Sequence, residues 1–133
     1  MLLNQTTPRI FIAATRQNDG KTTTAVGMYS SLRERFAQVG YIKPIGQRFV
    51  EISGKKIDED TVLINNTYHP GLPLEAMSPI AVDPWFTRYY LDKGDPSELK
   101  GRVEEAFNRA SWEQDFVVIE GCLLYTSPSP RDA

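Results

Sequence analysis

The sequence predicts an α/β fold in which a parallel β-sheet is flanked by helices. Short apolar segments rich in β-branched residues occur at three places, residues 9–14, 41–45 and 115–121. Between them lie segments in which apolar residues recur every three or four positions, as they do along one face of a helix. Buried strands that alternate with amphipathic helices are typical of parallel sheets, because parallel neighbours are joined by helical crossovers.

The first strand and the helix after it carry the plainest patterns. The run RIFIAA, residues 9–14, is nearly all apolar, which is typical of a strand buried on both faces. A helix is predicted after Thr22, and Gly40 is placed to end it. The apolar face of this helix is expected to hold Ala25, Met28, Tyr29, Leu32, Phe36 and Val39.

The second strand is predicted at YIKPI, residues 41–45. Its exit carries Lys43 and Pro44, since proline cannot donate a hydrogen bond inside a central strand. The run GKKIDED, residues 54–60, is interpreted as a solvated hairpin or loop. Residues 58–66 are predicted to form a short helix with acids in its first turn.

Prolines crowd residues 69–86, so a long ordered loop is predicted there. An aromatic group is expected to pack this loop onto the core, namely Trp85, Phe86, Tyr89 and Tyr90. Ser97 is predicted to cap the next helix. The buried face of that helix is expected to hold Leu99, Val103, Ala106, Phe107 and Ala110. The third strand, DFVVIEG, then ends in Glu120 and Gly121.

Composition excludes several classes of function. The chain has 133 residues and a formal net charge of −2, which provides no general field to attract nucleic acid or an anionic membrane. Its one cysteine and one histidine exclude an internal disulfide and a Cys/His metal cluster. No segment has the length of a membrane span or of a signal-peptide core. We therefore expect a soluble, cytoplasmic protein that binds neither nucleic acid nor membrane.

The end of the sequence breaks the α/β pattern. Residues 122–133, CLLYTSPSPRDA, show no periodicity and contain two Ser-Pro pairs. They are interpreted either as a disordered tail or as foreign sequence, because they resemble translated sequencing-adapter read-through. The domain is therefore expected to cover residues 1–121 and to be the N-terminal portion of a longer, truncated protein. We expect such a fragment to fold weakly and to be inactive by itself.

A glycine-rich loop, residues 14–27, follows the first strand and leads into the first helix. Gly20, Lys21 and Thr22 supply the second half of the pattern G-x-x-x-x-G-K-[ST], while Thr15 stands where its first glycine would be. Gly20 lets backbone N–H groups approach an anion, the helix directs its positive end at that anion, and Lys21 adds a full charge. The Thr22 hydroxyl can ligate Mg²⁺. This pattern predicts phosphate binding rather than a structural turn.

Glu120 supports the same prediction independently. It follows the apolar run FVVI at the carboxyl end of the third strand, and ligands of open α/β sheets gather at such strand ends. P-loop proteins place there the acid that faces the magnesium ion. The alternative is an acid that faces solvent at the end of a strand.

Five segments in this order resemble the first half of a dethiobiotin synthetase-type P-loop ATPase. They are ATRQNDGKTTTAVG, VGYIKPIGQ, DEDTVLI, MSPIAV and DFVVIEG. The same domain type occurs at the N-terminus of phosphotransacetylase-family proteins and in cobyrinic acid a,c-diamide synthase relatives. The resemblance covers about residues 8–121, and its most specific element is the Lys-Pro pair after the second strand. It implies a P-loop NTPase-type sheet that binds ATP and Mg²⁺.

The resemblance also implies roles for individual residues. Lys21 would contact the β- and γ-phosphate oxygens, and Lys43 would approach the γ-phosphate and the acceptor, so both are candidate catalytic residues. Thr22, Asp60 and Glu120 would hold Mg²⁺. Asp58 is a rival to Asp60, because either acid also suits the first turn of a helix. The nucleotide loop would consist of Thr15, Arg16, Gln17, Asn18, Asp19, Gly20, Lys21, Thr22 and Thr23.

Two departures bear on the function that the resemblance implies. Dethiobiotin synthetases open the loop with Gly-Thr-Asp-Thr, where this chain has residues 14–17, Ala-Thr-Arg-Gln, and their glycine-rich segment after Glu-Gly is replaced by Cys-Leu-Leu. The first hypothesis is an ATP-dependent ligase, homodimeric in full length, that activates a carboxylate or carbamate by phosphoryl transfer so that a nearby nucleophile displaces phosphate. Its expected partner is a small carboxylate or amine. The second is a regulatory nucleotide-binding module of a phosphotransacetylase-family protein. A partition- or switch-type ATPase is a third.

Overall fold

Strands and helices alternate along the chain, which confirms the predicted α/β class. The computed structural model describes residues 2–14, 21–92 and 94–122, although not the side chains of residues 14, 21–23, 90, 91, 96 and 122. The elements, in chain order, are β1 (Arg9–Ala14), α1 (Lys21–Arg35), β2 (Val39–Ile42), β3 (Ile45–Gly46), β4 (Phe49–Ile52), β5 (Lys55–Asp58), α2 (Glu59–Tyr68), α3 (Leu74–Met77), β6 (Ile80–Ala81), α4 (Pro84–Asp92), α5 (Pro96–Ser111) and β7 (Phe116–Cys122).

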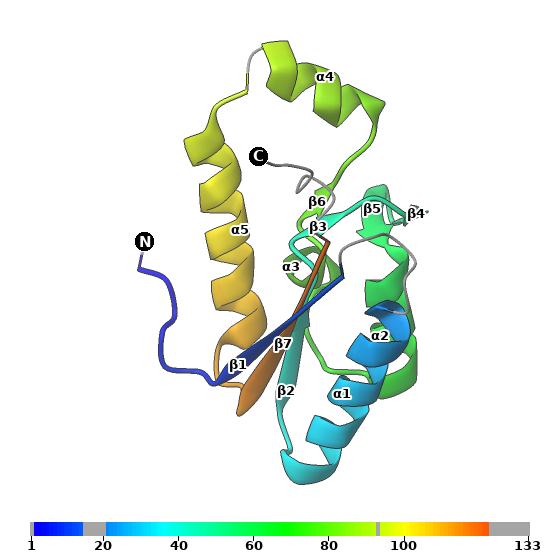
Figure 1. Ribbon diagram of the computed structural model, residues 1–133, viewed down its shortest axis with the longest axis vertical. Coiled ribbons are helices and arrows are strands. Elements are labelled where there is room, and N and C mark those ends of the chain that lie inside the picture. Colours follow the sequence, from blue (N-terminus) through cyan, green and yellow to red (C-terminus); the bar gives the residue numbers. More distant parts are fainter. Residues whose placement is uncertain (1, 15–20, 93, 123–133) are drawn as a thin grey trace.

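The main sheet has three parallel strands in the order β1-β7-β2. Figure 1 shows β7 between β1 and β2, with α5 on one side of these strands and α1 and α2 on the other. Ile12 of β1 pairs with Glu120, and Ile42 of β2 pairs with Ile119. All three strands therefore bring their carboxyl ends to the same edge, and β1 leads from there into the glycine-rich loop.

Apolar side chains fill both faces of this sheet. The larger cluster lies beneath α1 and α2 and consists of Ile12, Ala25, Tyr29, Leu32, Val39, Tyr41, Ile64, Met77 and Val118. The smaller cluster lies beneath α5 and consists of Ile42, Ala106, Phe107, Ala110 and Val117. Successive residues of a strand point to opposite faces, which is why neighbours such as Val117 and Val118 belong to different clusters.

Two small sheets extend the structure beyond the end of β2. The short strands β3 and β6 pair in parallel, while β4 and β5 form an antiparallel hairpin whose turn has positive φ at Ser53 and Gly54. This hairpin returns the chain to the sheet edge, so that α2 begins beside the end of β2. Within the described ranges, no helix is long and apolar enough to cross a bilayer.

The prediction that β1 is buried on both faces was wrong. Ile12 is buried, but the Phe11 side chain on the opposite face is 56% exposed. α1 packs against all three strands, whereas α5 packs mainly against β2 and β7, so that face of β1 has less cover. Among the described residues, β1 also has a strand neighbour on one side alone.

Two of the predicted helix boundaries, at Gly40 and at Ser97, were wrong. α1 ends at Arg35, and Gly40 lies inside β2. A Cβ atom at Gly40 would stand 2.2 Å from the Ala110 carbonyl oxygen, so glycine serves there to let α5 approach the strand. α5 is capped by Asp95, whose carboxylate accepts a hydrogen bond from the Ser97 N–H, and Pro96 occupies its first turn.

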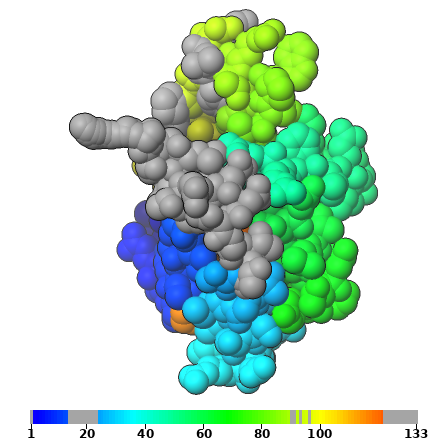
Figure 2. Space-filling view, turned by 45° about the vertical axis from the view of Figure 1, so that its right-hand side comes forward, coloured from blue at the N-terminus to red at the C-terminus, as the bar shows by residue number. Residues whose placement is uncertain are grey.

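The predicted loop at residues 69–86 contains α3, β6 and the start of α4. Trp85 and Tyr89 are 76% and 48% exposed, so these aromatic side chains do not anchor the segment to the core. Figures 1 and 2 place α4 at one end of the molecule. The run at residues 54–60 is a hairpin strand and the start of α2, and its Ile57 and Asp58 are buried rather than solvated.

Candidate functional site

The two-residue period of β-strands brings two charged side chains to one face of the main sheet. Tyr41 of β2 pairs with Val118 of β7, and both point into the cluster beneath α1 and α2. Lys43 comes two residues after Tyr41, and Glu120 comes two residues after Val118, so both follow onto the same face. This face meets the edge at which the strands end.

Lys43 lies at the centre of a buried acid cluster, which we define as Lys43, Asp58, Asp60 and Glu120. Its Nζ donates a hydrogen bond of 2.8 Å to Asp60 Oδ2 and lies 3.3 Å from Asp58 Oδ2 and 3.9 Å from Glu120 Oε2. The backbone N–H of Lys43 bonds to the Met77 carbonyl at 2.8 Å. The lysine is therefore fixed at both ends and is only 7% exposed.

Asp58 and Asp60 enter the cluster from the start of α2. The Asp58 carboxylate caps this helix by accepting a hydrogen bond of 2.9 Å from the Asp60 N–H, and its own N–H bonds to Ser78 Oγ. Its other oxygen, Oδ1, is turned toward Gly46, where an added Cβ would stand 2.4 Å away. Asp58 is 1% exposed, whereas the Asp60 side chain is 16% exposed and so reaches the surface.

Glu120 is completely buried and contacts three other polar side chains. Tyr41 donates a short hydrogen bond to Glu120 Oε1. Burial raises the pKa of Glu120 to about 7, and a hydrogen bond with the Asp60 carboxyl adds to this effect, while Tyr41 and Lys43 oppose it. Burial and the neighbouring Glu120 carboxylate raise the pKa of Tyr41 well above its usual value, so the phenol keeps its proton and acts as a donor.

The pKa of Lys43 shows that nearby charge outweighs burial. Burial alone would lower this pKa, but the hydrogen bond to Asp60 and the charges of Asp58 and Glu120 raise it above that of an ordinary lysine. Lys43 is therefore an ammonium ion at neutral pH. Burial raises the pKa of Asp58 despite the opposing charge of Lys43.

The phosphate-binding loop joins this edge between β1 and α1. Ala14, the last residue of β1, pairs with Cys122, two residues beyond Glu120. Lys21, Thr22 and Thr23 form the first turn of α1, and the structure describes their backbone alone. The other predicted loop residues lie outside the described residues: Thr15, Arg16, Gln17, Asn18, Asp19 and Gly20.

The chemistry of the acid cluster fits a magnesium ion. Three carboxyl groups face one ammonium, and the Asp60 and Glu120 carboxyls contact each other, so the cluster holds more acid than base. Mg²⁺ is commonly bound by one or two protein carboxylates together with water and substrate phosphates. Among the described residues, no three His, Cys, Asp or Glu side chains form a metal site by themselves.

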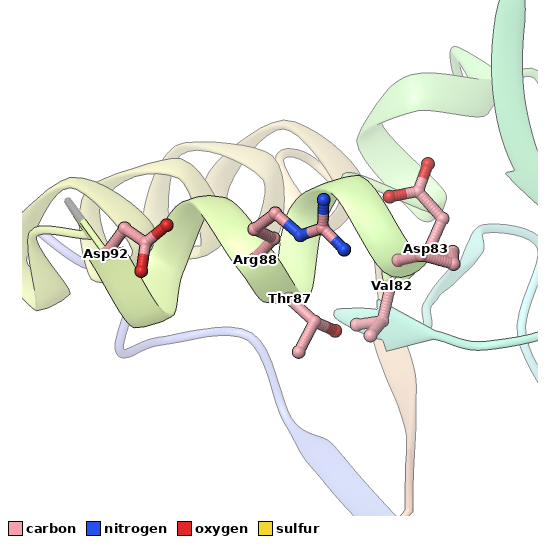
Figure 3. Close-up of a pocket in the computed structure, with 6 residues that line it drawn as sticks. Val82, Asp83, Thr87, Arg88 and Asp92 are labelled. Atoms are coloured by element: carbon pink, nitrogen blue, oxygen red, sulfur yellow. The ribbon is translucent and has the colours of Figure 1, made fainter.

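A separate hollow of about 670 Å³ lies along α4 and contains none of these residues. Figure 3 shows side chains from one continuous stretch lining it, including Asp83, Thr87, Arg88 and Asp92. Acid and base alternate along this wall.

Sequence reasoning identified Lys43, Asp60 and Glu120 as site residues, and the structure brings them together. It left Asp58 and Asp60 as rivals, and both lie in the cluster. It missed Tyr41 and Ser78. Tyr41 resembles any core aromatic in a strand, although its position two residues before Lys43 places it on the face of Lys43. Ser78 lies in the segment interpreted as a loop, and no sequence signal connects it to Asp58.

The comparisons with known proteins agree with this architecture. The family model described as "AAA domain" (AAA_26) matches residues 8–133. Among curated proteins, the chain is similar to the ATP-dependent dethiobiotin synthetase BioD of Methanocaldococcus jannaschii, with 29% identity over 128 residues. That alignment covers 92% of this chain but 56% of the relative, so the chain spans little more than half of the relative's length.

Proposed function

Because the chain belongs to the AAA-domain family of dethiobiotin synthetase-like P-loop ATPases, we propose that it binds ATP with Mg²⁺ at the edge formed by β1, β2 and β7. The observation that carries this proposal is the meeting of Lys43, Asp60 and Glu120 at the ends of β2 and β7. This is the edge from which β1 enters the glycine-rich loop. In this proposal, the glycine-rich loop and the buried acid cluster serve one site at the carboxyl ends of the strands.

The loop is proposed to hold the phosphates. α1 begins at Lys21, so its N-terminal N–H groups and the positive end of its dipole are available to an anion. Lys21 adds an ammonium for the β- and γ-phosphates, and the Thr22 hydroxyl adds an oxygen for the metal. Together these groups match the charge of a nucleoside triphosphate.

We assign the proposed metal role to Asp60 and Glu120 rather than to Asp58. Asp58 Oδ2 is occupied by the cap of α2 and by the Lys43 ammonium, whereas Oδ1 lies against Gly46 and has no hydrogen-bond partner among the described residues. Asp60 reaches the surface and contacts Glu120, so these two carboxyls can share one ion. A bound Mg²⁺ would neutralise phosphate charge. Asp58 would then remain as the partner that keeps Lys43 in place.

Lys43 is proposed to act during phosphoryl transfer. In a ligase, a carboxylate or carbamate oxygen of the acceptor attacks the γ-phosphorus, the bond to the bridging oxygen breaks, and ADP leaves. An amine then attacks the acyl phosphate and displaces inorganic phosphate, losing a proton. Charge accumulates on the transferred group, and the Lys43 ammonium is placed to neutralise it. The surrounding carboxylates hold the Lys43 ammonium in this position.

A regulatory nucleotide-binding module is the second candidate. The observation that favours it is the sequence Ala-Thr-Arg-Gln at residues 14–17, which keeps the first threonine of Gly-Thr-Asp-Thr but lacks its aspartate and its second threonine. In this alternative, ATP binds at the same edge and changes the conformation without driving ligation. The cytoplasmic location, a small carboxylate or amine partner and a homodimer remain predictions for the whole protein, as does the division into residues 1–121 and 122–133.

Two lysine variants test the proposal and separate the candidates. Because residues 1–133 alone are expected to be inactive, the unaltered chain and both variants are compared in the whole protein. ATP affinity is measured by calorimetry in excess Mg²⁺, and turnover is followed as ATP hydrolysis. Lys21→Ala should abolish ATP binding, because it removes a contact to the bound phosphates. Lys43→Ala should largely keep the affinity and lower turnover, as expected for an interaction formed mainly in the transition state.

The remaining outcomes are equally informative. Equal loss of affinity in both variants would make Lys43 a binding residue instead of a catalytic one. ATP binding by the unaltered chain without any turnover, and unchanged by Lys43→Ala, would favour the regulatory module. An unaltered chain that binds no ATP would contradict the proposal itself.

A further inference from the structure

Tyr41 contributes a fully buried hydroxyl beside the acid cluster, and the proposed function leaves it without a role. Its side chain is fully buried beneath α1 and α2, and its hydroxyl donates to Glu120 Oε1. A buried phenol needs a hydrogen-bond partner, but a backbone carbonyl is sufficient. Tyr29 in the same cluster uses one, since its hydroxyl donates to the Val39 carbonyl at 2.7 Å. Tyr41 instead contacts a residue of the proposed metal site.

The two oxygens of Glu120 have different surroundings. Oε1 meets the Tyr41 hydroxyl, whereas Oε2 lies 3.9 Å from the Lys43 ammonium. Without the phenol, Oε1 would lose the hydrogen bond that holds it in the core, and a buried carboxylate that loses a donor tends to turn away or take up a proton. The hydroxyl therefore fixes the orientation of the Glu120 carboxyl group relative to the cluster.

We propose that Tyr41 is a positioning residue for Glu120, holding Oε1 in the core so that Oε2 is presented to the cation of the site. The proposal rests on the proposed function, because it assigns Tyr41 an effect on Mg²⁺. In this proposal Tyr41 acts through Glu120, the residue to which its hydroxyl donates. Partners that orient metal ligands in this way typically change metal affinity by about 10- to 100-fold.

The test compares Tyr41→Phe with Tyr29→Phe in the full chain. Both variants remove one buried hydroxyl from the same apolar cluster and keep the ring. Affinity for a non-hydrolysable ATP analogue is measured by calorimetry in excess Mg²⁺ and again in excess EDTA, and the ratio of the two affinities reports the contribution of the metal. Tyr41→Phe should lower this ratio by about 10-fold and leave the affinity in EDTA unchanged. Tyr29→Phe should change neither.

A double variant shows whether Tyr41 acts through Glu120. In the Glu120→Gln background, Tyr41→Phe should cause no further loss of the metal contribution. A further loss as large as in the unaltered background would overturn the proposal, as would equal effects of Tyr41→Phe and Tyr29→Phe. A fall in affinity of the same size in Mg²⁺ and in EDTA would also overturn it, because that is the result of general disruption.

A measurement on the unaltered chain covers the case in which Tyr41→Phe does not fold. With ¹³C-labelled tyrosine, the ring resonance of Tyr41 should move when Mg²⁺ is added to the nucleotide complex, while that of Tyr29 should not. A stationary Tyr41 resonance would overturn the proposal. If the unaltered chain shows no difference between Mg²⁺ and EDTA, the proposed function fails, and the role of Tyr41 fails with it. Failure of the Tyr41 proposal alone leaves a clear effect of Mg²⁺.

Discussion

Two lysine–carboxylate pairs in this protein have nearly the same distance between their charged atoms, but the pKa values of their carboxyl groups shift in opposite directions. Lys43 Nζ lies 3.3 Å from Asp58 Oδ2, and Lys55 Nζ lies 3.2 Å from Glu75 Oε2. The first pair is buried, with side chains 9% and 1% exposed, whereas those of the second are 56% and 42% exposed. The pKa of Asp58 is raised, mainly by burial. The pKa of Glu75 is lowered, because the Glu75 carboxylate accepts hydrogen bonds from the Glu75 backbone N–H and from Lys55.

This difference shows that distance alone does not determine what an ion pair does. At the surface, water solvates both charges, so the pair gains little and costs little. In the buried cluster, each charge depends on its neighbours, and removing one leaves the others without compensation. Such an arrangement is sensitive to any added cation, which is the property that a metal and nucleotide site requires.

The largest effect is expected from Asp58→Ala, which removes one partner from the buried pair. The substitution takes away the cap of α2 and a charge next to Lys43, and it opens space beside Gly46. We expect the free energy of unfolding to fall by about 3 kcal/mol. Urea unfolding followed by circular dichroism measures this change.

Asp58→Asn is the matched control for that variant. The amide keeps the volume and an oxygen that can cap α2, so its cost should be clearly smaller than that of Asp58→Ala. A loss below about 1 kcal/mol for Asp58→Ala would place the buried pair in the same class as surface pairs and remove the contrast.

The pH dependence of stability should follow the buried acids. Glu120 has an ordinary pKa of 4.5 in the unfolded chain and about 7 in the folded protein, so between these values the folded state binds more protons. The free energy of unfolding should therefore fall as the pH rises from about 4.5 to about 7, and the contribution of Glu120 is lost above that range. Asp58, with its raised pKa, contributes in the same direction.

Thermal or urea unfolding measured across this pH range gives the slope of the free energy of unfolding against pH. Glu120→Gln should make it shallower, because the amide does not titrate. The Lys43 ammonium stays charged throughout, since its pKa is raised, and so does not contribute to the slope. Stability that rises between pH 5 and 7 and is insensitive to Glu120→Gln would contradict the raised pKa of Glu120.

The parts of the site that follow from strand periodicity could be predicted from the sequence. Lys43 and Glu120 each end an apolar run, and parallel strands bring such ends together, so their meeting required no knowledge of the loops. Asp60 was identified through the family resemblance. The sequence could not decide between Asp58 and Asp60, because either acid suits the first turn of a helix, and only the folded chain shows that Asp58 is the buried cap of α2 and that Asp60 reaches the surface.

Most of the errors in the fold come from contacts between distant segments. The boundary expected at Gly40 depends on the approach of α5 to β2, whereas the cap at Asp95 is a local pattern, since its carboxylate accepts from the Ser97 N–H two residues later. Residues 69–86 contain short elements whose partners lie elsewhere in the chain, as β6 pairs with β3. Local patterns do not register such contacts. Tyr41 was missed for the same reason, since its hydroxyl becomes informative only when β7 lies beside β2.

The smallest effect is expected from Lys55→Ala in the exposed pair. Removing this ammonium should change the free energy of unfolding by less than about 0.5 kcal/mol, because water replaces the lost contact to Glu75. Raising the salt concentration should reduce even that difference. Urea unfolding at low and high salt checks both statements. If Lys55→Ala lowered the free energy of unfolding as much as Asp58→Ala, exposure to solvent would not explain the difference between the two ion pairs.

Proton release on binding Mg²⁺ and ATP tests the central claim most directly, namely that the buried acid cluster is the metal end of a nucleotide site. Metal ligands must lose their protons, and at pH 6 Glu120, with a pKa of about 7, is mostly protonated. Calorimetry in buffers with different ionisation enthalpies counts the protons released per nucleotide bound. The unaltered chain should release most of one proton more than Glu120→Gln, and the excess should vanish at pH 8. Equal proton release by the two chains at pH 6 would contradict the account.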